Sequence, residues 1–152
     1  MHDQGGLAVQ QLASWMELST SITHLLLDGA HVNDAGIAAL GHALAINTSL
    51  QVLSLNRNFI NDDGGEALAA GARAHVSLQH LRLERNSFLE LRGCTALVDA
   101  AHAAPDGALH VLLPRLEVPY HVRDTHARWE MAEEIIELEH RAGACVAWGR
   151  RY

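Results

Sequence analysis

Large aliphatic residues recur along this chain in three copies of one pattern, and corresponding positions of successive copies lie 28 residues apart. The copies are Ile22-x-x-Leu25-x-Leu27, Leu50-x-x-Leu53-x-Leu55 and Leu78-x-x-Leu81-x-Leu83. A fixed period in this range is typical of proteins built from stacked supersecondary units. The pattern therefore predicts a repeat architecture, in which each unit covers the hydrophobic face of the next.

Each copy can be divided into a strand, a turn and a helix. Leu25 and Leu27 have the two-residue period of a strand, so both point inward and the residue between them points outward. Asn33-Asp34 then offers short acceptor side chains for a helix N-cap, and the apolar residues that follow have helical spacing. In the second copy, Asp62 is the predicted cap of the corresponding helix. We expect every unit to place its helix behind its strand.

The strands and turns also carry a motif that is specific enough to suggest a family. The segments Leu53-x-Leu55-x-x-Asn58-x-Ile60 and Leu81-x-Leu83-x-x-Asn86-x-Phe88 resemble leucine-rich repeats. The 28-residue spacing and the helical stretch Gly36–Leu44 are similar to the ribonuclease-inhibitor-like class, which includes the recognition domains of NOD-like receptors and the Ran GTPase-activating proteins. The resemblance implies an α/β solenoid of about 3–4 repeats, with parallel strands on a concave face and helices on a convex face. It also implies that the concave face holds another protein.

In this family an asparagine in each turn hydrogen-bonds the backbone between layers, and the resemblance assigns that role to Asn58 and Asn86. The local chemistry agrees, because asparagine readily satisfies nearby main-chain groups. Ala30 occupies the same position in the first copy. We therefore expect the first turn to lack this bond and to be the loosest of the three.

The repeats predict a solenoid over residues 1–113 and a C-terminal segment over residues 114–152. The solenoid divides into a partial first repeat, two full repeats, a degenerate repeat and a last strand, at 1–21, 22–49, 50–77, 78–105 and 106–113. The C-terminal segment contains a predicted helix that Asp124 or Thr125 caps and that Gly143 ends. Two arrangements are compatible with the sequence: a cap that covers the concave face, or an arm that projects from it.

The chain opens on the helix of a repeat whose strand is missing. A terminal repeat usually presents a polar outer face, but this helix is apolar. The candidate residues of this N-terminal edge are Leu7, Leu12, Trp15 and Met16. The edge favours an alternative hypothesis, in which the chain is a structural subunit of a larger assembly or homo-oligomer and docks through it. A piece of a longer repeat receptor is a third interpretation.

Outward residues of the strands form columns on the predicted concave face, and neighbours in a column lie on strands about 4.8 Å apart. The 28-residue period places His24, Val52, His80 and Ala108 in one column, and Leu26, Ser54, Arg82 and His110 in the next. The candidate partner-binding residues are His24, Leu26, Asp28, Val52, Ser54, Asn56, Arg57, His80, Arg82, Glu84, Arg85 and His110. Mixed charge around exposed Leu26 and Val52 is typical of an interface centre, so the main hypothesis is a non-enzymatic protein–protein interaction module.

Composition and charge narrow the classes of partner. The formal net charge of −7 disfavours nucleic acid or an anionic membrane surface. The first six residues have no basic region and no apolar region, so we expect no secretory signal, and no apolar run reaches the roughly 18 residues of a membrane span. Cys94 and Cys145 lack metal-like spacing, which favours free thiols in a reducing compartment. We therefore expect a cytoplasmic or other intracellular protein with protein partners.

Neither a metal site nor a catalytic motif is evident among these residues. The chain has 11 histidines, but His24 and His80 fall two predicted strands apart, and His80 and His110 fall in different predicted columns. No nucleophile stands with a base, and no phosphate-binding loop or carboxylate pair has the required spacing. We therefore expect no cofactor and no enzymatic activity. A fragment of a GTPase activator is kept as a distant alternative.

Overall fold

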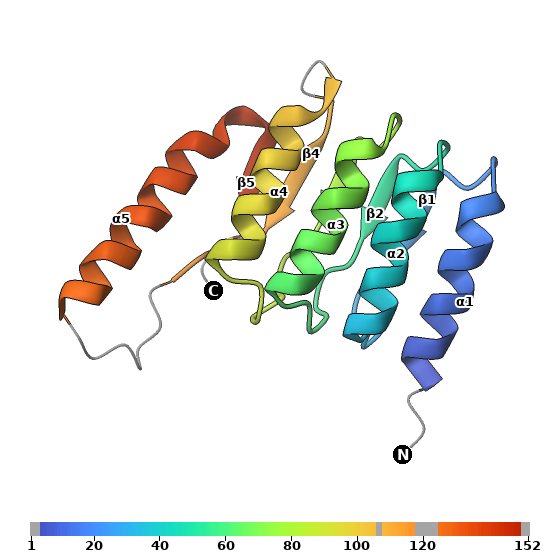
Figure 1. Cartoon of the computed structure of the whole chain (residues 1–152), viewed down its shortest axis with the longest axis horizontal. Helices are drawn as coiled ribbons and strands as arrows, with labels where there is room; N and C mark the ends of the chain where they lie inside the picture. The colour runs from blue at the N-terminus through green and yellow to red at the C-terminus, as the bar shows by residue number, and fades with distance from the viewer. Residues whose placement is uncertain (1–3, 106–107, 118–124, 150–152) are drawn as a thin grey trace.

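The computed structural model describes residues 4–105, 108–117 and 125–149, and in this part helices and strands alternate along the chain (Figure 1). The helices are α1 (Gln4–Leu18), α2 (Asp34–Ile46), α3 (Asp62–Ala74), α4 (Leu91–Ala103) and α5 (Thr125–Ala142). The strands are β1 (His24–Leu26), β2 (Val52–Ser54), β3 (His80–Arg82), β4 (His110–Leu113) and β5 (Val146–Trp148). A short 3-10 turn, Gly143–Cys145, joins α5 to β5.

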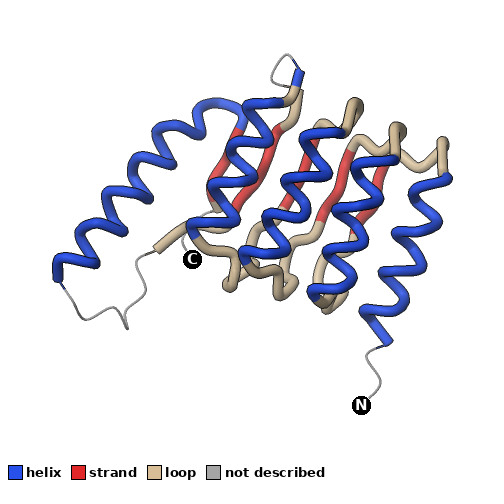
Figure 2. Tube along the Cα trace, viewed as in Figure 1, coloured by secondary structure: helices blue, strands red, loops and turns tan. Residues whose placement is uncertain are grey.

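The strands form one parallel sheet in the order β1-β2-β3-β4-β5, so each strand pairs with its sequence neighbours. The helices lie in a row on one side of this sheet, as the colouring by secondary structure makes clear (Figure 2). Parallel neighbours need a crossover, and here each crossover carries a helix back along the same face. The fold is the predicted α/β leucine-rich-repeat solenoid.

Strand register keeps the 28-residue period across the first three strands and then departs from it. His24 pairs with Val52, and Val52 pairs with His80, but His80 pairs with His110. The predicted columns placed His110 beside Arg82, and this was wrong by two residues. The extra residues come after β3: α4 begins one residue later than the period predicts, and β4 one further residue later. A shift of two keeps every β4 side chain on its predicted face, because strand side chains alternate.

The core is a stack of leucines between the sheet and the helices. Leu53, Leu55, Leu81 and Leu83 are fully buried, whereas Leu25 and Leu27 are only partly buried because β1 is the edge strand. Burying a leucine side chain contributes roughly 1.5–3 kcal/mol. The central repeats are therefore the most strongly held part of the solenoid.

Buried asparagines connect successive turns. The Asn58 side chain donates to the carbonyls of Leu27 and Leu55 at 2.9 and 3.0 Å, and its Oδ1 accepts from the Val32 amide at 3.2 Å. Asn86 donates in the same way, to the carbonyls of Leu55 and Leu83. Each asparagine thus joins its own layer to the preceding one. Ala30 provides no such bond, yet Asn58 reaches across to hold the first turn.

One helix cap differs from the sequence-based expectation. Asn33 caps α2 by accepting from Gly36, as predicted, but α3 is capped by Asn61, which accepts from Gly64 at 2.9 Å. Asp62 was the predicted cap. Its Oδ1 instead accepts from the amides of Glu90 and Gly93 at 2.8 and 2.9 Å. Asp62 therefore satisfies the first turn of α4, whose own N-cap residue makes no side-chain capping bond.

The C-terminal segment continues the two layers. Helix α5 packs beside α4 in the helix row, and β5 extends the sheet beyond β4 (Figure 1). Ile135 and Leu138 form the buried seam of α5, and Gly143 ends the helix with a φ of +60°. The predicted capping residue Asp124 lies outside the described residues. Because α5 lies on the helix side, it does not cover the outward face of the sheet.

Candidate binding surfaces

Strand side chains on the concave face differ strongly in exposure. Leu26 is 65% exposed, and the side chains of His24, Arg82 and His110 are exposed as well. Val52, by contrast, is buried, since it lies in the column between His24 and His80. The expectation that Val52 is an exposed contact residue was therefore wrong. Leu26 provides exposed apolar surface among the strand residues of this face.

The ends of β1, β2 and β3 are tied together by a polar network. Ser54 Oγ donates to Asp28 Oδ1 at 2.6 Å, and the Asn56 amide donates to the same oxygen at 2.9 Å. Asn56 Oδ1 accepts from the Glu84 amide at 2.8 Å. Ser54 is consequently buried, although it was expected in a partner-binding column. These groups hold the strand ends in register, because each bond joins neighbouring repeats.

Beyond this network lies a polar hollow of about 240 Å³, formed where the strands turn toward the helices. Its lining residues are Asp28, Asn56, Arg57, Glu84 and Arg85. Arg57 and Arg85 have φ values of 57° and 59°, a left-handed conformation that is uncommon for residues other than glycine. The tight turns thus carry both arginine side chains to the rim of the concave face.

The C-terminal half of the concave face carries a cluster of cationic and titratable side chains. The rings of His80 and His110 stack with centroids 5.6 Å apart and an angle of 24° between their planes. Arg82 shares with them a hollow of about 290 Å³, which Leu112 and Cys145 also line. Arg82 forms no ion pair with any residue that the structure describes. Its charge is therefore available to a partner.

The predicted N-terminal edge is only partly exposed. Leu7 and Trp15 are 58% and 61% exposed on the outside of α1, while Leu12 is half-buried. Met16 is fully buried and cannot contribute to an edge surface, which corrects the prediction for this residue. It lies with Val9 and Ala13 in the hydrophobic core, because these three residues share the inner face of α1. Leu18, at the end of α1, adds to the exposed apolar surface at 85%.

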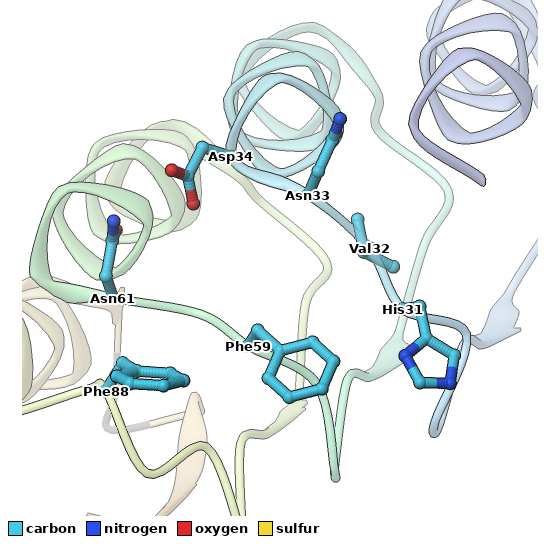
Figure 3. Close-up of a pocket in the computed structure, with 7 residues that line it drawn as sticks. All are labelled: His31, Val32, Asn33, Asp34, Phe59, Asn61 and Phe88. Atoms are coloured by element: carbon cyan, nitrogen blue, oxygen red, sulfur yellow. The ribbon is translucent and has the colours of Figure 1, made fainter. Parts of the chain in front are cut away.

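An aromatic surface that the sequence did not single out lies on the turns between strands and helices. His31, Phe59 and Phe88 stand in a row, with Asp34 above them at the start of α2 (Figure 3). The His31 and Phe59 ring centroids are 5.4 Å apart, and those of Phe59 and Phe88 are 6.3 Å apart. The row borders a hollow of about 410 Å³. The signal in the sequence was position: His31 and Phe59 are one period apart, immediately before two core residues.

The described residues contain neither a metal site nor a membrane-spanning helix. No group of three or more histidine, cysteine, aspartate or glutamate side chains is arranged to hold a metal ion there. No described helix is long and apolar enough to cross a membrane. The stacked His80–His110 pair has no third ligand of this kind beside it in the described residues.

Comparison with known proteins agrees with the fold. A family profile described as "Leucine Rich repeat" matches residues 47–69, which contain β2 and the first part of α3. Among solved structures, it is similar to one named "Leiomodin-1 Actin-Binding Site 2 (ABS2)", with a TM-score of 0.67 and 15% sequence identity. The match covers 95% of this chain and 79% of the leiomodin-1 chain. At this identity the similarity establishes the fold alone. No curated protein matches the sequence significantly.

Proposed function

We propose that the chain is a non-enzymatic protein-binding module of the ribonuclease-inhibitor-like class, and that it holds its partner on the concave face. The observation that carries the proposal is the outward sheet face, which no described helix covers and on which Arg82 has no ion-pair partner among the described residues, beside the stacked His80 and His110. The 28-residue period and the helix in every repeat support the class assignment.

The chemistry of this face suits a protein partner better than a small molecule. The exposed side chain of Leu26 lies two strands from Arg82, so apolar and charged contacts are spread over about 10 Å of sheet. Arginine is enriched at the centre of protein interfaces, because its planar guanidinium group forms paired hydrogen bonds with carboxylates. A partner that presents a carboxylate to Arg82 and an apolar side chain to Leu26 would match both groups.

Reversing the charge of Arg82 tests the proposal. We expect Arg82→Glu to abolish capture of a specific partner from a native extract, and the double change Arg82→Glu with Glu84→Arg to abolish it as well. Arg73→Glu, which reverses an exposed arginine on the convex helix α3, is the matched control and should retain the partner. Circular dichroism checks that each variant is folded. Capture that is equal for Arg82→Glu and Arg73→Glu would contradict the concave-face proposal.

Actin is a defined first partner for this assay, because the similar leiomodin-1 structure is named as an actin-binding site. Co-sedimentation of the purified chain with filaments, and gel filtration with monomeric actin, give a direct answer for both forms. Binding that Arg82→Glu removes would support the concave-face proposal and identify the partner. Binding that persists in that variant would place the contact elsewhere on the molecule.

A second candidate function rests on the N-terminal edge. Exposed Leu7, Trp15 and Leu18 lie on α1, which packs against α2 at the end of the helix row (Figure 1). A subunit of a larger assembly or a homo-oligomer would cover this surface, and obligate contacts of that kind are apolar. Light-scattering mass distinguishes the two cases: a monomer has 16.5 kDa. An oligomer that Leu7→Glu with Trp15→Glu converts into a folded monomer would support this second function.

A further inference from the structure

We infer that the aromatic row His31–Phe59–Phe88 is a second binding site, which takes an arginine side chain from a segment of a partner protein. Both phenylalanines of the chain lie in this row, and they are 53% and 57% exposed. A chain that buries the repeated leucines of its central strands but leaves both phenylalanine rings in solvent has an aromatic surface that core packing does not explain. The row lies on the turns, so it is distinct from the concave strand face.

The backbone that carries the two phenylalanine rings is held by buried residues next to them. The amides of Asn58 and Ile60, on either side of Phe59, both donate to Asn86 Oδ1, at 3.1 and 3.3 Å. The Leu89 amide, directly after Phe88, donates to the Asn86 carbonyl at 3.1 Å. Asn86 therefore fixes the backbone under both rings. Rings carried on a fixed backbone have only their own two side-chain torsions to order when a partner binds.

His31 is positioned by the preceding layer in a similar manner. The Val32 amide donates to Asn58 Oδ1, and the Val32 side chain is buried. His31 itself has a φ of 52°, which turns its ring toward Phe59. Figure 3 shows the three rings along one side of the hollow, with the Asp34 carboxylate on the other side. The hollow of about 410 Å³ is within the roughly 300–1,000 Å³ that ligand sites occupy.

The charge around the hollow favours a cation. Asp34 is exposed and forms no ion pair with a described residue. At the neighbouring amino end of α3, the carboxylates of Asp62, Asp63 and Glu66 share one guanidinium group, that of Arg92. Arg57 is close in sequence to Phe59, but it lines the separate hollow that contains Asp28 and Glu84. This edge of the molecule therefore carries surplus negative charge.

The helix dipole does not reverse this preference. The amino end of α2 carries a partial charge of about +0.5, and the Asn33 side chain already accepts from one of its free amides. The full negative charge of Asp34 exceeds that partial charge. An anionic ligand such as a phosphate group would therefore meet a carboxylate, while a guanidinium group would meet one favourable charge and two ring faces.

Arginine fits these features better than lysine does. Its planar guanidinium group stacks on aromatic faces and donates hydrogen bonds from its edge, so Phe59 and Asp34 can be satisfied together. The apolar stem of the side chain then lies along the second ring. The occupant is consequently a protein segment with an arginine between apolar residues.

The experiment uses the full chain, labelled with ¹⁵N, and three blocked tripeptides: Leu-Arg-Leu, Leu-Glu-Leu, and Leu-citrulline-Leu as the uncharged isostere of the first. We expect Leu-Arg-Leu to produce saturable shifts in the amide signals of residues 31–34, 59–61 and 88. Leu-Glu-Leu should produce none, and the citrulline peptide should bind several-fold more weakly. Shifts that are absent at millimolar peptide, or equal for the arginine and citrulline peptides, would overturn the inference.

Variants distinguish the contribution of the aromatic rings from nonspecific hydrophobic binding. The double change Phe59→Ala with Phe88→Ala should weaken Leu-Arg-Leu binding at least about tenfold, and Asp34→Asn should weaken it several-fold while reducing its salt dependence. Phe59→Leu keeps the apolar volume but removes the ring, so it should still lose affinity. Wild-type affinity in Phe59→Leu would overturn the cation–π assignment.

Two control variants test the location of the site. Val76→Ala removes an exposed apolar side chain just after the carboxyl end of α3, and it should bind the peptide like the wild type. Arg82→Glu should also leave peptide binding unchanged, because Arg82 lies on the concave face. A loss of binding in either variant would contradict the placement on the aromatic row.

Discussion

His75 occupies the position in its repeat that Asn47 occupies one repeat earlier, and the two side chains make the same local bonds. Asn47 Oδ1 accepts from the amides of Ser49 and Leu50 at 2.9 and 2.8 Å. His75 Nδ1 accepts from the amides of Ser77 and Leu78 at 3.1 and 3.0 Å. The difference is on the far side of the side chain. Asn47 Nδ2 donates to the Met16 and Ser19 carbonyls, whereas His75 Nε2 is buried without a hydrogen-bond partner among the described residues.

This relationship predicts a pH-dependent stability that asparagine would remove. Burial lowers the pKa of His75 below its ordinary value of 6.5, so the unfolded chain binds a proton more readily than the folded chain. The stabilising contribution is complete above about pH 6.5 and is lost as the pH falls below it toward the folded-state pKa. Protonation would also place a hydrogen on Nδ1, where two amides already donate. We therefore expect His75→Asn to lose less unfolding free energy than the wild type between pH 7 and pH 5.

Urea unfolding at several pH values measures this effect, and the difference between variant and wild type isolates it from the carboxylates that titrate in the same range. The control is His24→Asn, since the His24 side chain is exposed on β1. Parallel pH profiles for wild type and His75→Asn would show that the buried ring does not contribute to the acid sensitivity of the fold.

The second prediction concerns Asn86, which supports two turns at once. Its side chain donates to the Leu55 and Leu83 carbonyls and accepts from the Asn58 and Ile60 amides, all in buried surroundings. We expect Asn86→Ala to lower the unfolding free energy by about 2–4 kcal/mol, because it leaves buried polar groups without partners. Exposed Ser87→Ala is the control and should change it by less than about 0.5 kcal/mol. A loss below about 1 kcal/mol for Asn86→Ala would mean that water replaces the side chain.

The architecture was predictable because the repeat signal is redundant. The inward leucines, the turn asparagines and the helical apolar spacing all have the same period, so an error at one position does not change the fold. The register of β4 was harder to predict. Two residues are added to the repeat after β3, and periodicity alone does not locate inserted residues. Alternation still placed His110 on the outward face, but its neighbour proved to be His80 rather than Arg82.

The candidate sites were less predictable, because exposure depends on neighbours that the sequence does not identify. Val52 was expected on the concave face from its position in a strand column, and Met16 at the N-terminal edge from its apolar side chain, but flanking elements bury both. Asn61 and Asp62 are equally suitable as caps on chemical grounds, so the choice between them depends on the backbone. The Phe59–Phe88 contact depends on the geometry of two turns. The two residues do not occupy equivalent positions of the 28-residue repeat, so the period does not predict that they lie together.

The third prediction tests close packing between α2 and α3. A methyl group added at Gly71 would collide with the carbonyl oxygen of Gly41 and approach the Leu44 side chain to 2.9 Å. Glycine to alanine within a helix normally stabilises by roughly 1 kcal/mol through helix propensity. Here we expect the opposite sign, a loss of about 1–3 kcal/mol, because backbone atoms cannot move aside as side chains do. Thermal and urea unfolding of Gly71→Ala would measure it.

The matched control for this prediction is Ala70→Gly, on the exposed side of the same helix. It should cost roughly 1 kcal/mol by propensity alone, without any packing term. Gly71→Ala with a stability equal to or above that of the wild type would show that the two helices can separate at no cost. In that case the close approach of α2 and α3 would not be important for the rigidity of the solenoid.

The fourth prediction concerns the two thiols, which are both free but lie in different surroundings. Cys94 is fully buried in α4, and burial, together with the nearby charge of Asp62, raises the pKa of its thiol far above the ordinary range. Cys145 is partly exposed in the turn before β5, where its Sγ contacts the Ala142 carbonyl at 3.5 Å. Since the thiolate is the reactive form, we expect native-state alkylation at pH 8 to modify Cys145 at least about tenfold faster than Cys94. Cys145→Ser should remove the fast phase of alkylation, and unfolding in urea should expose Cys94 to the reagent. Equal alkylation rates for the two thiols in the native protein would contradict the buried position of α4 in the stack.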